Sequence, residues 1–251
     1  MGMVIDPRLN IIDKRLYSIK RLIGVSGGKG GVGKSLIATV LALTLSRLGY
    51  HVGLLDLDLS APSAHVILGI ESVYPKEEKG IVPPVVHGIE FMSIVYFTGD
   101  GPAPFRGIDI SNAMLELLAI TRWGSLDFLI VDMPPGIGDA MMDVIRWMKR
   151  VEFLIVTTPS KVALETVKKV IKLLTELKFP IIGVIENMKI RESSLVKDEL
   201  KKVAVPILGE IGFDMKIEDS IGDVNKLLES CFAVEMREIV LKSPEFKLQL
   251  K

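Results

Sequence analysis

The chain has 251 residues, of which 49% are hydrophobic and 25% charged, so there is enough apolar material for a fully buried sheet. Lys plus Arg and Asp plus Glu both number 31, which excludes a globally basic protein that recruits nucleic acid or an anionic membrane. The single cysteine, Cys231, excludes an intrachain disulfide, and no membrane-length apolar run or signal-peptide core is present. We therefore expect a soluble cytoplasmic protein.

Strand and helix patterns alternate along most of the chain, after a polar lead-in at residues 1–20. In this lead-in, Asp6-Pro7 predicts a helix start, with Leu9, Ile12 and Leu16 on one helical face. Over residues 21–241 the alternation predicts a single α/β domain with a mostly parallel sheet and helices on both faces, followed by a tail at 242–251.

The predicted helices and strands follow from hydrophobic periodicity and from the Gly and Pro residues that mark their ends. Asp139 is the expected N-cap of the predicted helix at residues 140–149. Surface loops are expected at 71–84 and 99–107. The predicted strands are 21–25, 51–55, 89–95, 127–131, 153–156, 181–185 and 207–211. The predicted helices are 34–48, 110–121, 140–149, 163–177 and 194–203, with further helical material to about 241.

A glycine-rich loop, SGGKGGVGKS at residues 26–35, connects the first strand to the helix that follows it. Glycines tolerate positive φ and lack a Cβ atom, so backbone N–H groups can converge on an anion at the helix start. The pattern G-x-x-x-x-G-K-[ST] is that of a P-loop, which assigns Lys34 to the β- and γ-phosphates and the Ser35 hydroxyl to Mg²⁺. The expected nucleotide contacts are Gly28, Lys29, Gly30, Gly31, Val32, Gly33, Lys34 and Ser35.

Two other interpretations of this loop stay open. Gly28, Gly30 and Gly33 also satisfy the dinucleotide pattern G-x-G-x-x-G, with Asp56 near the place of a ribose-binding acid. The loop could also be a turn without a ligand, although its glycines would then cost backbone entropy for no return. A Lys-Ser pair at the helix start favours the P-loop, because a dinucleotide loop has no need of it.

Carboxylates follow two of the predicted strands. Asp132 ends the buried-strand run FLIVD and supplies the acid that a P-loop needs on its Mg²⁺ side. Asp56 and Asp58 follow the second strand, at the sheet edge where parallel α/β folds bind ligands. We expect one of this pair to touch Mg²⁺ and the other to orient an attacking water. Alternatively, Asp132 starts a turn, Asp56 is only a cap and Asp58 is a solvated turn residue.

The loop GKGGVGKS, with Lys29 as a second lysine, resembles the deviant Walker A loop of the MinD/ParA/arsenite-pump group of P-loop ATPases. Within that group, residues from about 21 to 222 resemble the Mrp family of iron–sulfur carrier ATPases. This likeness rests on WGSLDFLIVDMPPGIGD at 123–139, Arg106-Gly107, TTP at 157–159, VAL at 162–164, ENM at 186–188 and LGEI at 208–211.

The resemblance implies a role for four residues. Lys29 would reach the phosphates of the opposite subunit in a nucleotide-dependent homodimer. Asp58 would orient water, Asp132 would be the Walker B acid, and Asn187 would read the adenine base. An asparagine at a strand end is also a common turn former, so Asn187 has this second interpretation.

The chain departs from the Mrp pattern where that family holds its cluster. The family's C-x-x-C pair follows the E-N-M segment, whereas residues 189–194 read KIRESS here. A homodimer would offer two thiolates, both Cys231, whereas a simple cluster needs about four. We therefore expect no bound iron–sulfur cluster, and we expect Cys231 to be a buried apolar residue. No metal-ligand spacing connects the histidines His51, His65 and His87.

The leading interpretation is an Mg²⁺-dependent ATPase that works as a homodimer, acts on a partner protein and is accessory to iron–sulfur cluster assembly without carrying a cluster. Its cofactors would be ATP and Mg²⁺. The expected catalytic residues are Lys29, Lys34 and Asp58. The expected metal-side residues are Ser35, Asp56 and Asp132.

Two rival functions remain. A MinD- or ParA-like positioning ATPase would need a membrane-binding helix or a basic surface for DNA. The tail contains Pro244 and alternates more like a strand, so the membrane signal is poor, and the neutral charge balance gives no support for DNA binding. A small-molecule kinase or carboxylate-ligating enzyme on the same loop would need a substrate pocket that the sequence does not reveal.

Overall fold

The computed structural model describes residues 6–98, 108–190 and 195–248. Eight strands form one sheet in the order β10-β9-β8-β1-β7-β2-β6-β5. Every neighbouring pair is parallel except β5 and β6. These strands are β1 (Arg21–Gly27), β2 (Val52–Asp56), β5 (Val85–Val86), β6 (Ile89–Ser93), β7 (Phe128–Asp132), β8 (Val151–Thr157), β9 (Ile181–Lys189) and β10 (Ile207–Gly212).

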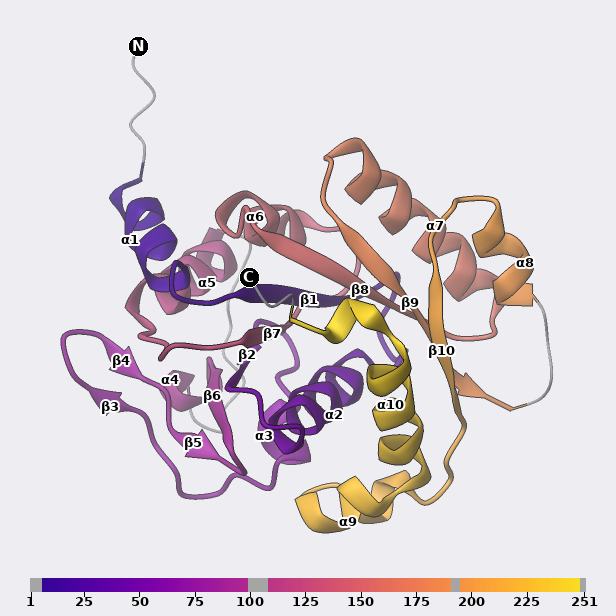
Figure 1. Cartoon of the computed structure of the whole chain (residues 1–251). Helices are drawn as coiled ribbons and strands as arrows, with labels where there is room; N and C mark the ends of the chain where they lie inside the picture. The colour runs from indigo at the N-terminus through magenta and orange to yellow at the C-terminus, as the bar shows by residue number, and fades with distance from the viewer. Residues whose placement is uncertain (1–5, 99–107, 191–194, 249–251) are drawn as a thin grey trace.

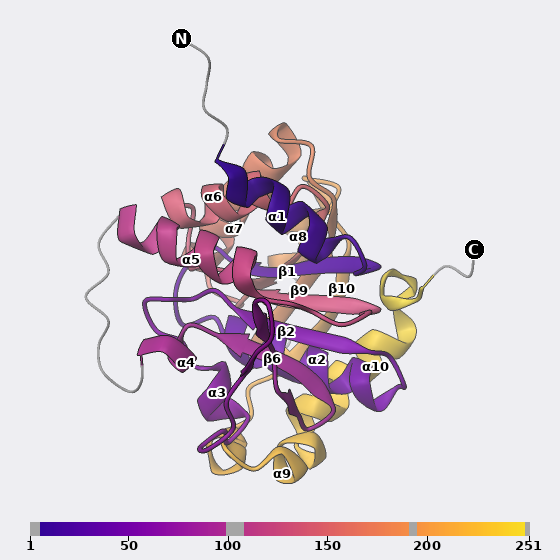
Figure 2. The ribbon, with the colours of Figure 1, turned by 90° about the vertical axis from the view of Figure 1, so that its left-hand side faces the viewer.

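Helices cover both faces of the sheet (Figures 1 and 2). One face carries α1 (Pro7–Leu16), α5 (Ile108–Ile120), α6 (Asp139–Trp147), α7 (Lys161–Glu176) and α8 (Leu195–Lys201). The other carries α2 (Lys34–Arg47), α3 (Ala64–Ile67), α9 (Val224–Glu229) and α10 (Cys231–Lys242). Shorter elements are α4 (Val95–Thr98) and the 3₁₀ turns η1 (Ile217–Ser220) and η2 (Pro244–Phe246). The predicted α/β fold with helices on both faces is confirmed.

Two hydrophobic cores lie on opposite sides of the sheet, because alternate side chains of a strand point to opposite faces. In β7, Phe128 and Ile130 join the core on the α2 side, whereas Leu129 and Val131 join the core on the α5–α7 side. All five residues of β7 are buried. Burial on both faces explains why this strand is a continuous apolar run and does not alternate with polar residues.

Some boundaries differ from the predicted ones. The segment expected as a loop at 71–84 contains a two-stranded antiparallel sheet, β3 (Lys76–Glu77) with β4 (Ile81–Val82). Gly138 is the N-cap of α6 with an extended backbone, and Asp139 is its first residue, so the prediction that Asp139 is the cap was wrong. Asp139 still places a negative charge in the first turn, where the helix dipole favours it. The predicted loop 99–107, which holds the Arg106-Gly107 motif, lies outside the described residues.

The lead-in forms the predicted helix. The Asp6 carboxylate accepts a hydrogen bond from the Arg8 N–H at 2.9 Å and caps α1, and Ile12 and Leu16 are buried on its inner face. The tail differs from the expected alternation, since it forms η2 and Phe246 is only 1% exposed. Within 6–98, 108–190 and 195–248, no helix is long and apolar enough to cross a bilayer.

Candidate functional site

The strand order brings the predicted acids beside the glycine loop. Asp132 is in register with Val25 of β1 on one side and with Asp56 of β2 on the other. Leu54 and Ile130, two residues before these acids, belong to the α2-side core, so Asp56 and Asp132 also project toward α2. Because α2 begins directly after the loop, both carboxylates lie at the start of that helix.

The backbone of the loop requires glycine at particular positions. Gly31 and Gly33 have φ of +77° and +83°, which glycine tolerates and other residues rarely adopt. A Cβ atom on Gly33 would lie 2.3 Å from the Asn187 Nδ2 atom, and one on Gly28 would lie 2.7 Å from the Thr166 Cβ atom of α7. The loop thus rests on α7 and β9, and its N–H groups stand at the start of α2, where a helix binds anions.

Lys34, the predicted phosphate ligand, is buried and held by two acids. Its Nζ atom lies 2.5 Å from Asp132 Oδ1 and 3.5 Å from Asp58 Oδ2. The Lys34 side chain is 8% exposed, and that of Asp132 is 0% exposed. The lysine and the acid that would serve the phosphates and the metal are therefore paired with each other.

Asp56 and Asp58 brace the chain segment that follows β2. The Asp56 carboxylate accepts hydrogen bonds from the backbone N–H groups of Asp58 at 3.1 Å and Ala64 at 3.4 Å. Asp58 accepts a hydrogen bond from the Ser60 hydroxyl at 2.7 Å. Burial, and then the nearby charge of Asp132, raise the pKa of Asp56 from 3.8 to about 8. Asp56 therefore keeps its proton to a higher pH than an ordinary aspartate does.

The donor set at Asp132 fits a magnesium ion that arrives with phosphates. Asp132 Oδ2 is buried and has no hydrogen-bond partner among the described residues. Burial raises the pKa of Asp132, while the Lys34 ammonium and the Ser35 hydroxyl lower it. In the part of the chain that the structure describes, no three His, Cys, Asp or Glu side chains form a metal-binding group. Mg²⁺ usually takes one or two carboxylates and completes its shell with phosphates and water, which this arrangement allows.

Asn187, the predicted adenine reader, contacts the loop itself. It lies on β9, is 2% exposed, and its Nδ2 atom donates a hydrogen bond to the Val32 carbonyl at 2.9 Å. Ile185, two residues before Asn187 on β9, belongs to the α2-side core. Asn187 therefore projects to the same face of the sheet as Asp56 and Asp132. The structure places Asn187 at the P-loop, and its contact with adenine stays a prediction.

A cavity of about 580 Å³ opens over the loop, between Lys29 and the segment after β2. Lys29 lines this cavity and is exposed, with no hydrogen bond or ion pair to any described residue. The cavity wall also includes Val66, Ile217 and Glu218, which the sequence had not indicated. Val66 lies on α3, in the segment after β2, whereas Ile217 and Glu218 belong to η1, where the chain returns to the site after β10.

Cys231 is exposed, so the prediction that it is a buried apolar residue was wrong. It is the first residue of α10, whose buried stripe runs through Phe232, Met236 and Val240. Position 231 falls outside this stripe by helical periodicity. The thiol is therefore open to solvent.

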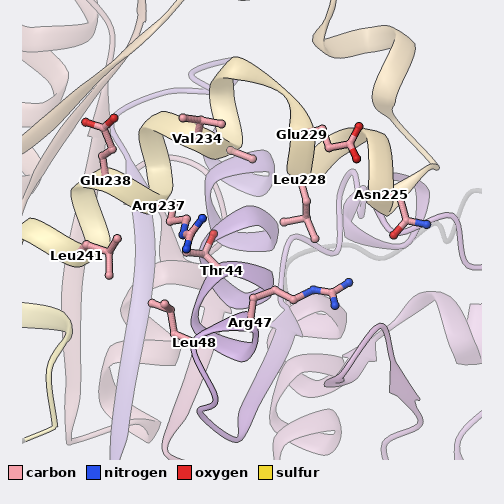
Figure 3. A pocket seen from close by; sticks show the side chains of 11 residues that line it. Thr44, Arg47, Leu48, Asn225, Leu228, Glu229, Val234, Arg237, Glu238 and Leu241 are labelled. Atoms are coloured by element: carbon pink, nitrogen blue, oxygen red, sulfur yellow. The ribbon is translucent and has the colours of Figure 1, made fainter.

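A second cavity, of about 640 Å³, lies between α2, α9 and α10 (Figure 3). Its lining combines apolar side chains with four charged residues, Arg47, Glu229, Arg237 and Glu238. None of its lining residues is a predicted site residue, and it shares none with the cavity over the loop. Most of the predicted nucleotide residues line the other cavity: Lys29, Gly30, Gly31, Gly33, Lys34 and Ser35.

Comparisons with known proteins concern the family and the fold of this chain. The family model described as ParA, NUBPL iron-transfer P-loop NTPase, matches residues 18–242. An iron–sulfur cluster carrier protein of Pseudomonas fragi is 41% identical over 179 residues, which cover 70% of this chain and 62% of that relative. The chain therefore spans less than two thirds of the length of this curated relative.

Solved structures share the fold. An ADP-bound nucleotide-binding protein of Archaeoglobus fulgidus is 29% identical, with a TM-score of 0.76 over 90% of this chain and 96% of the other. The septum site-determining protein MinD of Pyrococcus horikoshii, complexed with Mg-ADP, is 22% identical, with a TM-score of 0.66 over 87% and 93% of the two chains. At 22% identity, the similarity to MinD shows only that the fold is shared.

Proposed function

We propose, from the premise that the chain belongs to the NUBPL iron-transfer family of P-loop NTPases, that it binds ATP together with Mg²⁺ and hydrolyses it in the cytoplasm. The observation that carries this proposal is the convergence of three features at the start of α2. They are the glycine cradle, Lys34, and an Asp132 oxygen that has no hydrogen-bond partner in the described part of the chain. Together they offer an anion site beside a carboxylate for a hard cation.

Each residue of the site has a role in this proposal. Lys34 binds the β- and γ-phosphates after it leaves Asp132. Asp132 and Ser35 hold Mg²⁺, with Asp56 on the metal side, and the ion supplies charge neutralisation for the phosphates. Asp58 orients the attacking water. Since phosphoryl transfer depends mainly on positioning and electrostatic stabilisation, these residues need to form no covalent intermediate.

We further propose that the active form is a nucleotide-dependent homodimer. Lys29 is exposed at the mouth of the cavity and has no acidic partner among the described residues. A lysine in this position is available to the nucleotide of a second subunit, where its charge would add to that of Lys34. The dimer would pass its nucleotide state to a partner protein.

Three measurements on the purified protein test these proposals: phosphate release, mass by light scattering, and nucleotide binding. With ATP and Mg²⁺, the parent should release phosphate, and its mass by light scattering should double. Lys34→Met should abolish nucleotide binding. Lys29→Ala should bind nucleotide yet remain a monomer, whereas Lys172→Ala, a control on α7 with a side chain 78% exposed, should dimerise like the parent. Dimerisation of Lys29→Ala would refute the role of Lys29, and a parent that binds no nucleotide would refute the proposed function.

The metabolic role that we propose is accessory to iron–sulfur cluster assembly, without a cluster on this chain. The family is described by iron transfer, and the Pseudomonas relative by cluster carriage. This chain has one cysteine, fewer than a cluster between two subunits requires. Anaerobic reconstitution with iron and sulfide, followed by desalting, should leave no visible absorption band. A stoichiometric cluster that survives desalting would contradict the proposal.

A further inference from the structure

We propose that the groove between α2, α9 and α10 is a docking site for an amphipathic helix of a partner protein, with acidic side chains beside the apolar face of that helix. The groove is the cavity of about 640 Å³ shown in Figure 3. This inference rests on the proposed function only for the existence of a partner protein. Its own basis is separate, because the groove shares no lining residue with the cavity over the glycine loop.

One face of α2 and one face of α10 form the two sides of the groove. Residues at intervals of four line it from α10, namely Ala233, Arg237 and Leu241. This stripe is about 12 Å long, which is a little over two helical turns. Residues one turn apart line it from the end of α2, namely Thr44, Arg47 and Leu48. The groove is therefore long enough for two turns of a docked helix.

Apolar side chains remain open to solvent in this groove. Leu48, Val234 and Leu241 are 36%, 49% and 51% exposed. Figure 3 shows Leu48 and Leu241 directed toward each other from α2 and α10. The opposite stripe of α10, which includes Phe232 and Met236, is already buried in the α2-side core. A helix with one face in the core usually presents polar residues on its other face, so these apolar side chains indicate a surface that a partner covers.

Two arginines give the groove a charge preference. Arg47 and Arg237 are exposed and have no hydrogen bond or ion pair with a described residue. The carboxylates of Glu229 and Glu238 extend away from α2 in the view of Figure 3, and Glu238 Oε2 lies 2.7 Å from the Nζ atom of Lys242. The guanidinium groups are therefore available to carboxylates of a partner, which arginine binds through paired hydrogen bonds.

An acidic amphipathic helix fits these features better than a membrane or a nucleic acid does. Those two partners are bound by clusters of basic residues, whereas this groove has two arginines beside two acids. Apolar side chains inserted between two helices, with charged pairs beside them, are typical of helix-in-groove recognition. Because α2 begins at Lys34 and ends at Arg47, a helix docked at its far end would leave the nucleotide cavity open.

Fluorescence anisotropy with two short stapled helical peptides measures this preference. Both peptides have the same leucine stripe, and they carry either glutamate or lysine beside it. We expect the parent to bind the acidic peptide about tenfold more tightly than the basic one. The double variant Arg47→Glu/Arg237→Glu should instead prefer the basic peptide, because the charge of the groove is then reversed. Arg146→Glu, a control on α6 with a side chain 71% exposed, should keep the preference of the parent.

A variant without a charge change measures the apolar contact. Leu241→Ser should weaken the binding of both peptides by a similar factor, because the loss of apolar contact does not depend on peptide charge. ADP binding should be the same in the parent and in all of these groove variants. A parent that binds the two peptides equally, or that does not bind the acidic one, would overturn the proposal.

The same proteins distinguish the other outcomes. A mass that doubles without nucleotide in the parent, but not in the double variant, would assign the groove to a second copy of this chain and overturn the proposal. A double variant with the peptide preference of the parent would also overturn it. A parent that binds the acidic peptide with the expected preference but binds no ADP refutes the proposed nucleotide function and supports the docking site.

Discussion

The nucleotide-free protein should lose stability as the pH rises toward 8, and Asp56 is the expected cause. Burial raises the pKa of this carboxyl from 3.8 to about 8 in the folded state. Between these two values the folded protein keeps a proton that the unfolded chain has released. A raised pKa therefore contributes stability that is complete below about pH 4 and is lost as the pH rises through about 8.

The size of this loss of stability follows from the release of one proton by Asp56. Each pH unit between the two pKa values changes the free energy of unfolding by about 1.4 kcal/mol. From pH 6 to pH 8, where the Asp56 carboxyl of the unfolded chain is already ionised, the expected loss is roughly 2 kcal/mol. This is a large part of the stability of an ordinary domain, which is about 5–15 kcal/mol.

Urea unfolding at pH 6, 7 and 8 in EDTA measures this slope. Position 56 cannot titrate in Asp56→Asn, so the free energy of unfolding of this variant should lack the Asp56 contribution to the pH dependence. Plotted against pH, it should cross the free energy of unfolding of the parent as the pH rises. Asp139→Asn, a charge change at an exposed site, should keep the slope of the parent. The other ionisable groups are common to the three proteins, apart from the substituted position, and their contributions cancel in the comparison. Parallel pH profiles for the parent and Asp56→Asn would refute the reasoning.

Three further predictions concern the loop, the thiol and the core. Gly33→Ala should weaken ADP binding and lower the melting temperature more than Gly31→Ala, because both positions have positive φ but only a Cβ atom on Gly33 meets Asn187. For Gly31→Ala the left-handed backbone alone should cost about 1–2 kcal/mol; equal losses in the two variants would contradict the contact. Cys231 should react with Ellman's reagent in the native protein nearly as fast as in urea, and protection of the thiol would contradict its exposure. Phe153→Ala, which removes a fully buried ring, should lower the free energy of unfolding by about 3–5 kcal/mol in denaturant titration, and a loss below about 1 kcal/mol would contradict its place in the core.

The sequence predicted the fold and the loop because their signals are local. The run from β1 through the glycine loop to α2 combines a buried strand, a spaced glycine pattern and an apolar helix within residues 21–47. Asp132 was also predictable, since it ends an apolar run that length and composition identify as a buried strand. Parallel strand order then brings such strand ends to one edge of the sheet.

Other features depend on contacts between distant residues and could not be predicted. The pairing of Lys34 with Asp132 joins positions 98 apart in the sequence, and no spacing rule reports it. The exposure of Cys231 was missed because cysteine is commonly buried. Whether this residue is buried depends on which face of α10 packs against the protein, and Cys231 lies outside that face. Ile217 and Glu218 line the cavity only because the chain returns to the site after β10.

The support of the glycine loop by the second half of the chain has a consequence for folding. Asn187, which bonds to the Val32 carbonyl, lies 155 positions after it, and the loop also rests on Thr166. Contacts at such separations form slowly, because a long stretch of chain must first be ordered. The loop can therefore reach its binding shape only after β8, α7 and β9 have assembled. In a refolding experiment, the recovery of nucleotide binding should lag behind the recovery of helical signal, so binding would mark the last stage of folding.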